Sequence, residues 1–321
     1  MSRGGTTHFQ PGDVIQQHFI LRKRLGTGGF GDIFQATSTL KRKPIEVALK
    51  VDVYEPTDNW LGKEVQTLSV VGGKPHFPKF IHSGIDGHYF FYAMELLGPN
   101  LYEIRKKQRT RTFSIQTTVN VVIQLLEAVQ TLHNCGFIHR DIKPMNVVIG
   151  GPSKAMHDLY LIDYGLCIPV LSREQYQETL YEESNIIGTF HYCSPTTHHR
   201  RECGRRDDII SLLYMAVEMR LGKLPWAGVT DMKELRKVKD SYCSEILMEG
   251  LPPEFAEIFM DVLGLQATTA PDYARYLKLL KQVQKRLSFN NRTPFDWEIS
   301  QPRASIPYKS PIKATKSDPV Q

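Results

Sequence analysis

The sequence predicts an α+β chain with two lobes of unequal size, a small β-sheet lobe containing one helix and a larger, mainly helical lobe. Two observations predict this class. Between about residues 19 and 97, strand-like apolar runs alternate with glycine-rich or Asp-Gly turns, and one stretch with helical spacing interrupts them. From about residue 117 onward, several stretches carry apolar side chains at helical spacing. A chain of 321 residues is long enough for one such two-lobed unit.

Composition is that of an ordinary globular protein, with 41% hydrophobic and 23% charged residues. The net charge of +6 is mildly basic, so we expect acidic or phosphorylated partners and no nucleic acid. The five cysteines are scattered and form no Cys-x-x-Cys pair, which predicts neither a disulfide framework nor a zinc site. No apolar run is long enough to span a bilayer, so we expect no membrane association and a cytoplasmic location, with nuclear access also allowed.

The stretch over residues 138–149 places an acid, a base and an amide between two short apolar runs. Asp141 can orient a hydroxyl and accept its proton, Lys143 can neutralise a phosphoryl group, and Asn146 can hold a divalent cation. Asp163 follows a second strand-like run and adds a carboxylate, the kind of oxygen ligand that magnesium prefers. The spacing indicates phosphotransfer chemistry and argues against the alternative, a polar turn between two strands.

These motifs resemble those of the eukaryotic protein kinase family, in which a His-Arg-Asp loop precedes an Asp-x-Gly tripeptide, here residues 139–141 and 163–165. The resemblance implies a bilobal protein kinase fold that uses ATP and Mg²⁺. It assigns catalytic roles to Asp141 and Lys143 and metal binding to Asn146 and Asp163.

A glycine-rich stretch near the N-terminus has the pattern Gly-x-Gly-x-x-Gly, which by itself also fits dinucleotide-binding folds. Those folds place a helix after the glycines, whereas here a strand-like run follows and a third strand-like run carries Lys50. A hairpin over a nucleotide with a lysine on the third strand is the kinase arrangement, so Lys50 should bind the α- and β-phosphates. The hairpin residues expected to contact the nucleotide are Leu25, Gly26, Thr27, Gly28, Gly29, Phe30, Gly31, Asp32 and Ile33.

The helical stretch over residues 60–71 carries Glu64, which is the candidate ion-pair partner of Lys50. Such a pair would fix the lysine for phosphate binding. A solvated helix carboxylate is the alternative interpretation.

The resemblance also implies an adenine site at the connection between the lobes. Met94 would occupy the gatekeeper position, and backbone groups of Glu95 and Leu97 would pair with the adenine. Ala48 and Val148 would pack on the two faces of its ring. For these apolar residues the alternative is plain core packing.

Two residues further along the chain complete the expected site. Thr189, at the end of a polar segment that matches the kinase activation segment, should bond near Asp141 and Lys143, a catalytic role that fits serine or threonine substrates. Asp208 begins a strongly apolar helix and matches the buried kinase aspartate that anchors the catalytic loop. It could also be an acid favoured at a helix N-terminus by the macrodipole.

Further motifs narrow the resemblance to the casein kinase 1 group, and two of them to its tau-tubulin kinase branch. His191 departs from the group, which commonly carries an anion-binding arginine there, and Tyr164 replaces the usual phenylalanine. The group motifs are Glu-Leu-Leu-Gly-Pro-Asn-Leu at 95–101, Ser-Pro-Thr-Thr at 194–197, Arg-Asp-Asp at 206–208 and Leu-Pro-Trp at 224–226, and the branch motifs are Pro-Asp-Tyr at 271–273 and Phe-Asp-Trp-Glu at 295–298.

The expected domain organisation is one kinase domain over residues 17–298, with the first lobe at 17–97 and the second at 98–298. A flexible N-terminal arm over residues 1–16 precedes it. Residues 299–321 shift to Pro, Ser, Thr and Lys without periodicity, which predicts a disordered basic tail.

We therefore expect a monomeric serine/threonine protein kinase that transfers the γ-phosphate of ATP to protein substrates. The alternatives are a pseudokinase or a scaffold that binds cytoskeletal partners. The substrates should be acidic or already phosphorylated, because basic residues follow the activation segment; the alternative is that the last two of these residues brace the segment or face solvent. The residues of this basic patch are His198, His199, Arg200, Arg201, Arg205 and Arg206.

Overall fold

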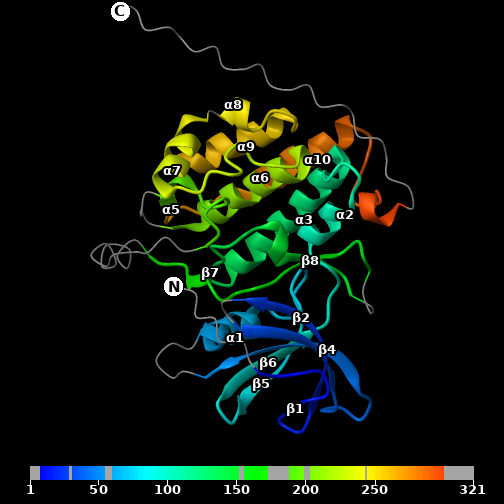
Figure 1. The fold of residues 1–321 in the computed structure, drawn as a ribbon. Coiled ribbons are helices and arrows are strands. Elements are labelled where there is room, and N and C mark those ends of the chain that lie inside the picture. The colour runs from blue at the N-terminus through cyan, green and yellow to red at the C-terminus, as the bar shows by residue number, and fades with distance from the viewer. Residues whose placement is uncertain are drawn as a thin grey trace, which may run out of the picture.

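The computed structural model describes residues 8–28, 31–54, 60–151, 155–172, 188–198, 203–242 and 244–299. These residues form a β-sheet lobe and a helical lobe that meet at the strand labelled β8 (Figure 1). This arrangement confirms the predicted α+β class with two lobes. Within the described ranges, no helix is long and apolar enough to cross a membrane.

The first lobe is built on an antiparallel sheet in the order β1-β2-β3-β4-β6-β5. Alternating side chains of the sheet form a core of their own, in which Phe19, Phe34 and Leu49 are fully buried. The register places Ile33 opposite Lys50, so the second strand of the β2–β3 hairpin lies directly beside the lysine in the sheet. The strands are β1 (Val14–Ile15), β2 (Phe19–Gly28), β3 (Gly31–Ser38), β4 (Ile45–Val53), β5 (Phe80–Asp86) and β6 (Tyr89–Glu95).

The described part of this sheet has six strands, and the first of them lies within the expected N-terminal arm. In this strand, β1, Val14 pairs with Ile20 and Ile15 with Phe19 across a short turn. The expectation of a flexible arm through residue 16 is therefore wrong at its C-terminal end. The reason is burial, because Ile15 is fully buried in the core of the sheet. Residues 1–7 lie outside the described part of the chain.

One helix, α1 (Trp60–Val71), packs on this sheet near β5 and β6. Its apolar residues Leu61 and Leu68 are buried, and Glu64 shares their helical face at the i+3 position from Leu61. The burial of this face therefore turns Glu64 inward, toward the strand that carries Lys50.

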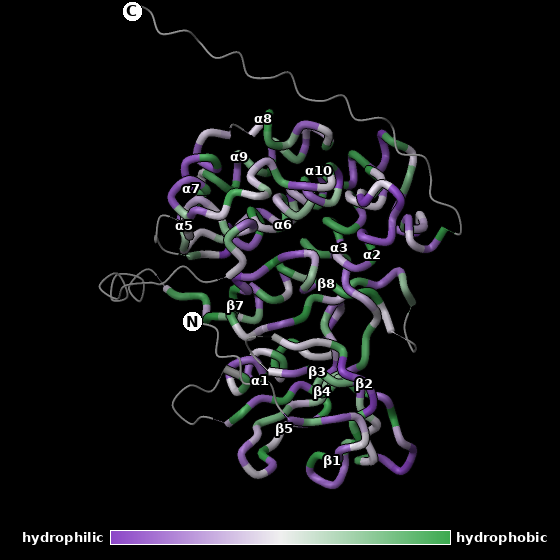
Figure 2. The backbone as a smooth tube through the Cα atoms, viewed as in Figure 1, coloured by the Kyte–Doolittle hydropathy of each residue, from purple (hydrophilic) through white to green (hydrophobic). Residues whose placement is uncertain are grey.

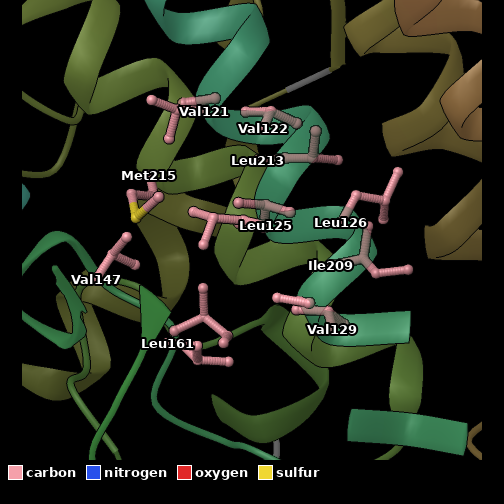
Figure 3. Packing of buried hydrophobic residues seen from close by; sticks show 14 of the residues in the cluster. Val121, Val122, Leu125, Leu126, Val129, Val147, Leu161, Ile209, Leu213 and Met215 are labelled. Atoms are coloured by element: carbon pink, nitrogen blue, oxygen red, sulfur yellow. The ribbon is translucent and has the colours of Figure 1, made fainter. Parts of the chain in front are cut away.

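The second lobe is organised around the helices α3 and α6. Figure 3 shows their buried side chains packing together, with Val122 and Leu126 of α3 near Leu213 of α6. Ser114 caps the N-terminus of α3, and Gly222 in the left-handed conformation ends α6. The helices are α2 (Leu101–Lys107), α3 (Ile115–Asn134), α5 (Pro195–His198), α6 (Arg205–Leu221), α7 (Met232–Ser241), α8 (Ser244–Leu247), α9 (Pro253–Gly264) and α10 (Tyr273–Arg286).

Short strands frame the segment that the sequence singled out. Strand β7 (Phe137–Ile138) pairs with β10 (Ile168–Pro169), and β8 (Val147–Ile149) pairs with β9 (Leu159–Leu161). The 3₁₀ helix η1 (Pro144–Asn146) leads into β8. Both ends of the loop at residues 139–146 are therefore anchored in paired strands.

The last described residues belong to the helical lobe. The 3₁₀ helix η2 (Asp296–Glu298) lies against the start of α3, where the Asp296 carboxylate accepts a hydrogen bond of 2.6 Å from the Ser114 amide. The Phe295 ring is fully buried and stacks on His157 and Trp297. The branch motif at 295–298 thus packs as part of this lobe.

Leu213→Ala should lower the free energy of unfolding by about 2–5 kcal/mol, because Leu213 is 1% exposed at the contact between α3 and α6. Urea unfolding followed by circular dichroism measures the change. Leu263→Ala is the matched control, since Leu263 on α9 is 39% exposed and its loss should cost about 0.5 kcal/mol or less. Equal losses for the two variants would contradict this account of the core.

Candidate functional site

Asp208 at the start of α6 fixes the backbone of the loop at residues 139–146. Its Oδ2 accepts a hydrogen bond of 2.7 Å from the His139 amide, and its Oδ1 accepts one of 2.8 Å from the Arg140 amide. Arg140 has a φ of 66°, a conformation that non-glycine residues adopt at a cost. The buried carboxylate therefore stabilises a backbone that the chain would not adopt by itself.

A second layer of hydrogen bonds extends from Asp208 to α10. His133 Nε2 donates to Asp208 Oδ2 at 2.8 Å, and the Tyr273 hydroxyl lies 2.5 Å from His133 Nδ1. Burial alone would raise the pKa of the Asp208 carboxyl, but hydrogen bonding and the charge of His133 outweigh it, and the pKa is lowered. Sequence reasoning singled out Asp208 and missed the role of His133 and Tyr273. The Pro-Asp-Tyr motif at residues 271–273, which contains Tyr273, was the only feature of the sequence that could have indicated this role.

Asp141 lies at the centre of a polar cluster within this loop. Its Oδ2 accepts from Lys143 Nζ at 2.6 Å and from Asn146 Nδ2 at 3.0 Å, and its Oδ1 accepts from the Thr189 hydroxyl at 2.8 Å. Thr189 Oγ1 in turn accepts from Lys143 Nζ at 2.8 Å. The structure thus brings together four of the predicted site residues, three from the loop and one from a segment more than 40 residues later.

Gly188 sets the distance between that later segment and the loop. Its φ is 100°, a region that favours glycine, and a Cβ atom at this position would lie 2.6 Å from the Arg140 carbonyl oxygen. Only a residue without a side chain permits this approach, which brings the following Thr189 within reach of Asp141.

Lys50, Glu64 and Asp163 form an ion-pair cluster between the lobes. Lys50 Nζ lies 2.7 Å from Glu64 Oε2 and 3.5 Å from Asp163 Oδ1, and its side chain is 6% exposed. Burial alone would lower the pKa of the Lys50 ammonium, but the two carboxylates outweigh it and the pKa lies above its ordinary value. Tyr92, which sequence reasoning did not single out, donates its hydroxyl to Glu64 Oε1 at 2.7 Å.

Asn146 and Asp163 offer an oxygen donor set that fits a hard divalent cation. Asn146 Nδ2 donates to the Asp141 carbonyl and to Asp141 Oδ2, and within the described residues no group donates to Asn146 Oδ1. Burial alone would raise the pKa of the Asp163 carboxyl, but Lys50, His139 and Lys143 outweigh it, and the lowered pKa keeps Asp163 ionised. Mg²⁺ typically takes one or two protein oxygens together with phosphate and water, which suits this pair.

The β2–β3 hairpin forms the expected cover beside Lys50. Gly26 pairs with Ile33, Thr27 with Asp32 and Gly28 with Gly31, while Leu25 is exposed; Gly29 and Phe30 lie outside the described residues. A Cβ atom at Gly31 would lie 2.3 Å from the Val51 carbonyl oxygen, so glycine is required for the packing of the hairpin.

Asp32 has a structural contact of its own within the hairpin. Its carboxylate is buried and lies 2.9 Å from Arg24 Nη1 on the neighbouring strand, so its side chain helps to hold the hairpin together. The physical reason is the cross-strand register, which places the acid within reach of Arg24. The expected contact of Asp32 with the nucleotide stays a prediction.

The expected adenine site lies where β6 leaves the first lobe. Met94 and Ala48 are paired across β4 and β6, and Val148 on β8 is 6% exposed. Glu95 donates its amide to the Lys79 carbonyl at 2.9 Å, so this amide does not pair with a ligand in the arrangement described. Among the described residues, neither the amide nor the carbonyl of Leu97 has a hydrogen-bond partner, as binding of a planar base edge requires.

The expected basic patch is only partly described. Arg205 donates to the Thr268 carbonyl at 2.5 Å, and Arg206 donates to the Thr196 hydroxyl at 3.2 Å. Arg206 thus braces the segment, the alternative that the sequence had left open, whereas Arg205 contacts the loop between α9 and α10. The side chain of His198 and residues 199–201 lie outside the described part of the chain.

The assembled geometry can hold a phosphate chain and a hydroxyl at adjacent places. Lys50 and Lys143 supply positive charge, Asn146 and Asp163 supply oxygen ligands, and Asp141 supplies a carboxylate next to Thr189. Tyr164, which differs from the expected phenylalanine, is accommodated without loss, because its hydroxyl donates to the Leu161 carbonyl at 2.5 Å.

Known proteins resemble this chain over most of its length. The protein kinase domain model matches residues 19–291. A Dictyostelium discoideum protein named as a probable serine/threonine-protein kinase is 32% identical over 292 residues, which cover 91% of this chain and 58% of that protein. The chain therefore spans little more than half the length of this curated relative.

Gly188→Ala should reduce the free energy of unfolding by about 1–3 kcal/mol, because the added methyl group would overlap the Arg140 carbonyl at an unfavourable φ. Chemical unfolding measures the loss. Gly264→Ala at the end of α9 is the matched control, since no atom lies within 4 Å of a Cβ there. If Gly188→Ala were as stable as this control, the close approach would not be a constraint.

Proposed function

Because the chain belongs to the protein kinase family, we propose that it is an ATP-dependent serine/threonine protein kinase, which transfers the γ-phosphoryl group of ATP to hydroxyl groups of proteins. The observation that carries this proposal is the Asp141 cluster beside the Lys50 ion pairs. Each charged group that phosphotransfer requires is present and lies within hydrogen-bonding or ion-pair distance of another member.

The chain's own residues divide the reaction into positioning and proton transfer. Lys50, held by Glu64, binds the α- and β-phosphates, and Asp141 orients the substrate hydroxyl. As the hydroxyl oxygen forms its bond to the γ-phosphorus, the bond to the oxygen shared with the β-phosphate breaks and the proton passes to Asp141. Mg²⁺ held by Asn146 and Asp163 would supply positive charge against the phosphate oxygens.

Thr189 supports a preference for serine and threonine. Its hydroxyl and amide both donate to Asp141 Oδ1, at 2.8 and 3.0 Å, so this oxygen is engaged from the segment that a substrate must pass. A short aliphatic hydroxyl can approach such a recessed carboxylate. The name of the Dictyostelium relative supports the same class.

The alternative, a pseudokinase or a scaffold for cytoskeletal partners, is disfavoured by the site. A protein that only binds partners would normally have lost Lys50, Asp141 or Asp163. All three are present, and the contacts between Lys50 and its two carboxylates are formed.

Finer assignments form part of the same proposal. The motifs at 95–101, 206–208 and 224–226 support the casein kinase 1 group, and those at 271–273 and 295–298 support its tau-tubulin kinase branch. The mild basic charge supports acidic, phosphorylated or cytoskeletal protein substrates. We further propose a monomer that acts in the cytoplasm and can enter the nucleus.

Asp141→Asn should lower the turnover of purified full-length protein with radiolabelled ATP and casein by about 10²–10⁴-fold, because the amide cannot accept the hydroxyl proton. ATP binding, measured by calorimetry, should stay nearly intact. Asp158→Asn, an exposed acid in the turn before β9, is the matched control and should keep full activity. Retention of more than about a tenth of wild-type turnover by Asp141→Asn would contradict the assigned role.

His191→Arg should raise the ratio of kcat/KM values for a phosphorylated over an unphosphorylated peptide at pH 7.5, because a permanently charged guanidinium pairs with phosphate through two parallel hydrogen bonds, which an imidazole ring cannot form. His191 belongs to the segment after Thr189, and its backbone carbonyl is already fixed by Trp226 Nε1. His88→Arg, on the exposed β5–β6 turn, controls for added charge. Equal ratios in all three proteins would show that this position does not read anions.

A further inference from the structure

The turn at residues 190–193 has its backbone carbonyls bound by side chains and not by a helix or a sheet. This turn directly follows Thr189, so its shape determines where Thr189 and an approaching substrate lie. Side chains from α6, α7 and the loop between them supply the donors. The contacts are Lys239 Nζ to the Phe190 and Cys193 carbonyls at 2.7 Å each, Trp226 Nε1 to the His191 carbonyl at 2.8 Å and Ser211 Oγ to the Tyr192 carbonyl at 2.8 Å.

Lys239 supplies two of these four contacts from a buried position. Most residues of α7 are hydrophilic (Figure 2), and the helix packs beside α5. Lys239 is nevertheless 4% exposed, with its ammonium 5.1 Å from the centre of the Trp226 ring and 5.3 Å from that of Tyr214. The aromatic faces attract the cation, and the two carbonyls direct it toward the turn.

The turn transmits its position to Thr189 through its own backbone. The Thr189 carbonyl accepts hydrogen bonds from the Tyr192 amide at 2.8 Å and the Cys193 amide at 3.2 Å. Thr189 and the turn therefore move together. Any group that fixes the turn also fixes the Thr189 hydroxyl relative to Asp141 and Lys143.

We propose that Lys239 is a positioning residue for phosphotransfer, which holds the turn at residues 190–193 so that Thr189 meets Asp141 and the substrate peptide meets a fixed surface. The kinetic part of this inference rests on the proposed kinase activity, whereas the structural part does not. Lys239 itself touches neither Asp141 nor the expected nucleotide site in the contacts described above.

The charge of Lys239 depends on pH near neutrality, so its contact with the turn should also depend on pH. Burial lowers the pKa of the Lys239 ammonium to about 7, against a smaller opposing effect of the Cys193 thiol. The titratable groups that face it in the described residues are Cys193 from the turn and Tyr214 from α6. Burial raises the pKa of Cys193 to about 11 and raises that of Tyr214 as well, so both stay neutral near pH 7.

Two further acids lie near this region. Asp240 is exposed on α7 itself, and burial raises the pKa of Asp207 on α6 to about 6. Both are present in every Lys239 variant. A difference between wild type and a variant therefore isolates the lysine.

Activity and stability should respond to pH in opposite directions. Above pH 7 the amine becomes neutral, its hydrogen bonds to the carbonyls lose their charge assistance, and peptide turnover should fall. The pKa of Lys239 in the folded state lies below the ordinary lysine value of 10.5, so the folded state binds fewer protons than the unfolded state between about pH 7 and 10.5. Stability should consequently rise with pH in this window.

Lys239→Met is the principal test, because methionine keeps an unbranched side chain of similar volume and lacks both the charge and the hydrogen-bond donor. At pH 6.5 it should lower kcat/KM for an unphosphorylated peptide roughly 10- to 100-fold, as misplacement of reacting groups does. The dissociation constant for ATP should change by less than about twofold. The deficit should shrink toward pH 8 as the wild-type lysine loses its proton. Lys233→Met, at an exposed position of α7, is the matched control and should match wild type.

Amide hydrogen exchange provides a readout that does not depend on activity. The Tyr192 and Cys193 amides should exchange at least several-fold faster in Lys239→Met than in Lys233→Met. The reason is that the turn loses the two hydrogen bonds from Lys239 to the Phe190 and Cys193 carbonyls, so the bonds of these amides to the Thr189 carbonyl open more often. If Lys239→Met fails to bind ATP, the pH dependence of amide exchange in the wild-type protein is the test of the proposal. Protection of these two amides, corrected for the intrinsic rate, should fall between pH 6.5 and 8.

The outcomes separate this inference from the proposed function. Unchanged peptide kinetics together with unchanged exchange in Lys239→Met would overturn the positioning role, while an active wild type would leave the kinase proposal standing. An inactive wild type would remove the kinase proposal, and faster exchange in the variant would still support the role of Lys239 in holding the turn. Protection in wild type that is constant with pH would overturn the contribution of the charge.

Discussion

The contact between the Asp208 carboxylate and the amides of His139 and Arg140 is the interaction on which the site depends. A buried carboxylate is costly unless donors surround it, and here two backbone amides and His133 supply them. The same hydrogen bonds also stabilise the loop, because they hold Arg140 in a backbone conformation with a positive φ. Without them, Asp141 would have no fixed direction relative to Lys143 and Thr189.

The two lobes are joined electrostatically where Lys50 of the sheet, paired with Glu64 of α1, meets Asp163 beyond β9. These residues come from three distant parts of the chain, so the cluster forms only when the lobes are in register. The ammonium lies among acceptors that raise its pKa and keep it charged. A phosphate ligand would therefore meet a preorganised cation, which does not have to be protonated or reoriented on binding.

The sequence predicted those parts of the site whose roles follow from local spacing. The acid, base and amide over residues 138–149 and the lysine on the third strand belong to this class, and the structure joins the first three to one another and pairs the lysine with Glu64 and Asp163. What it could not predict depends on packing between distant segments. Asp32 reads as part of a glycine-rich loop until the strand register brings Arg24 to it. From the sequence, Ile15 belongs to the expected N-terminal arm, but the sheet buries it. Lys239 is one of several charged residues on a hydrophilic helix in the sequence, but it is buried in the structure.

Helix α6 explains how the catalytic loop and the neighbouring turn keep a common geometry. Asp207, Ser211 and Tyr214 follow the i, i+4, i+7 spacing of one helical face. The first accepts a hydrogen bond from Ser194, the second donates to the Tyr192 carbonyl, and the third lies under the Lys239 ammonium. Asp208, one position further around the helix, faces the catalytic loop. A single helix, α6, therefore contacts both the catalytic loop and the turn at residues 190–193 and fixes their relative position. The turn can shift relative to Asp141 only if its side-chain contacts to α6 or α7 are broken.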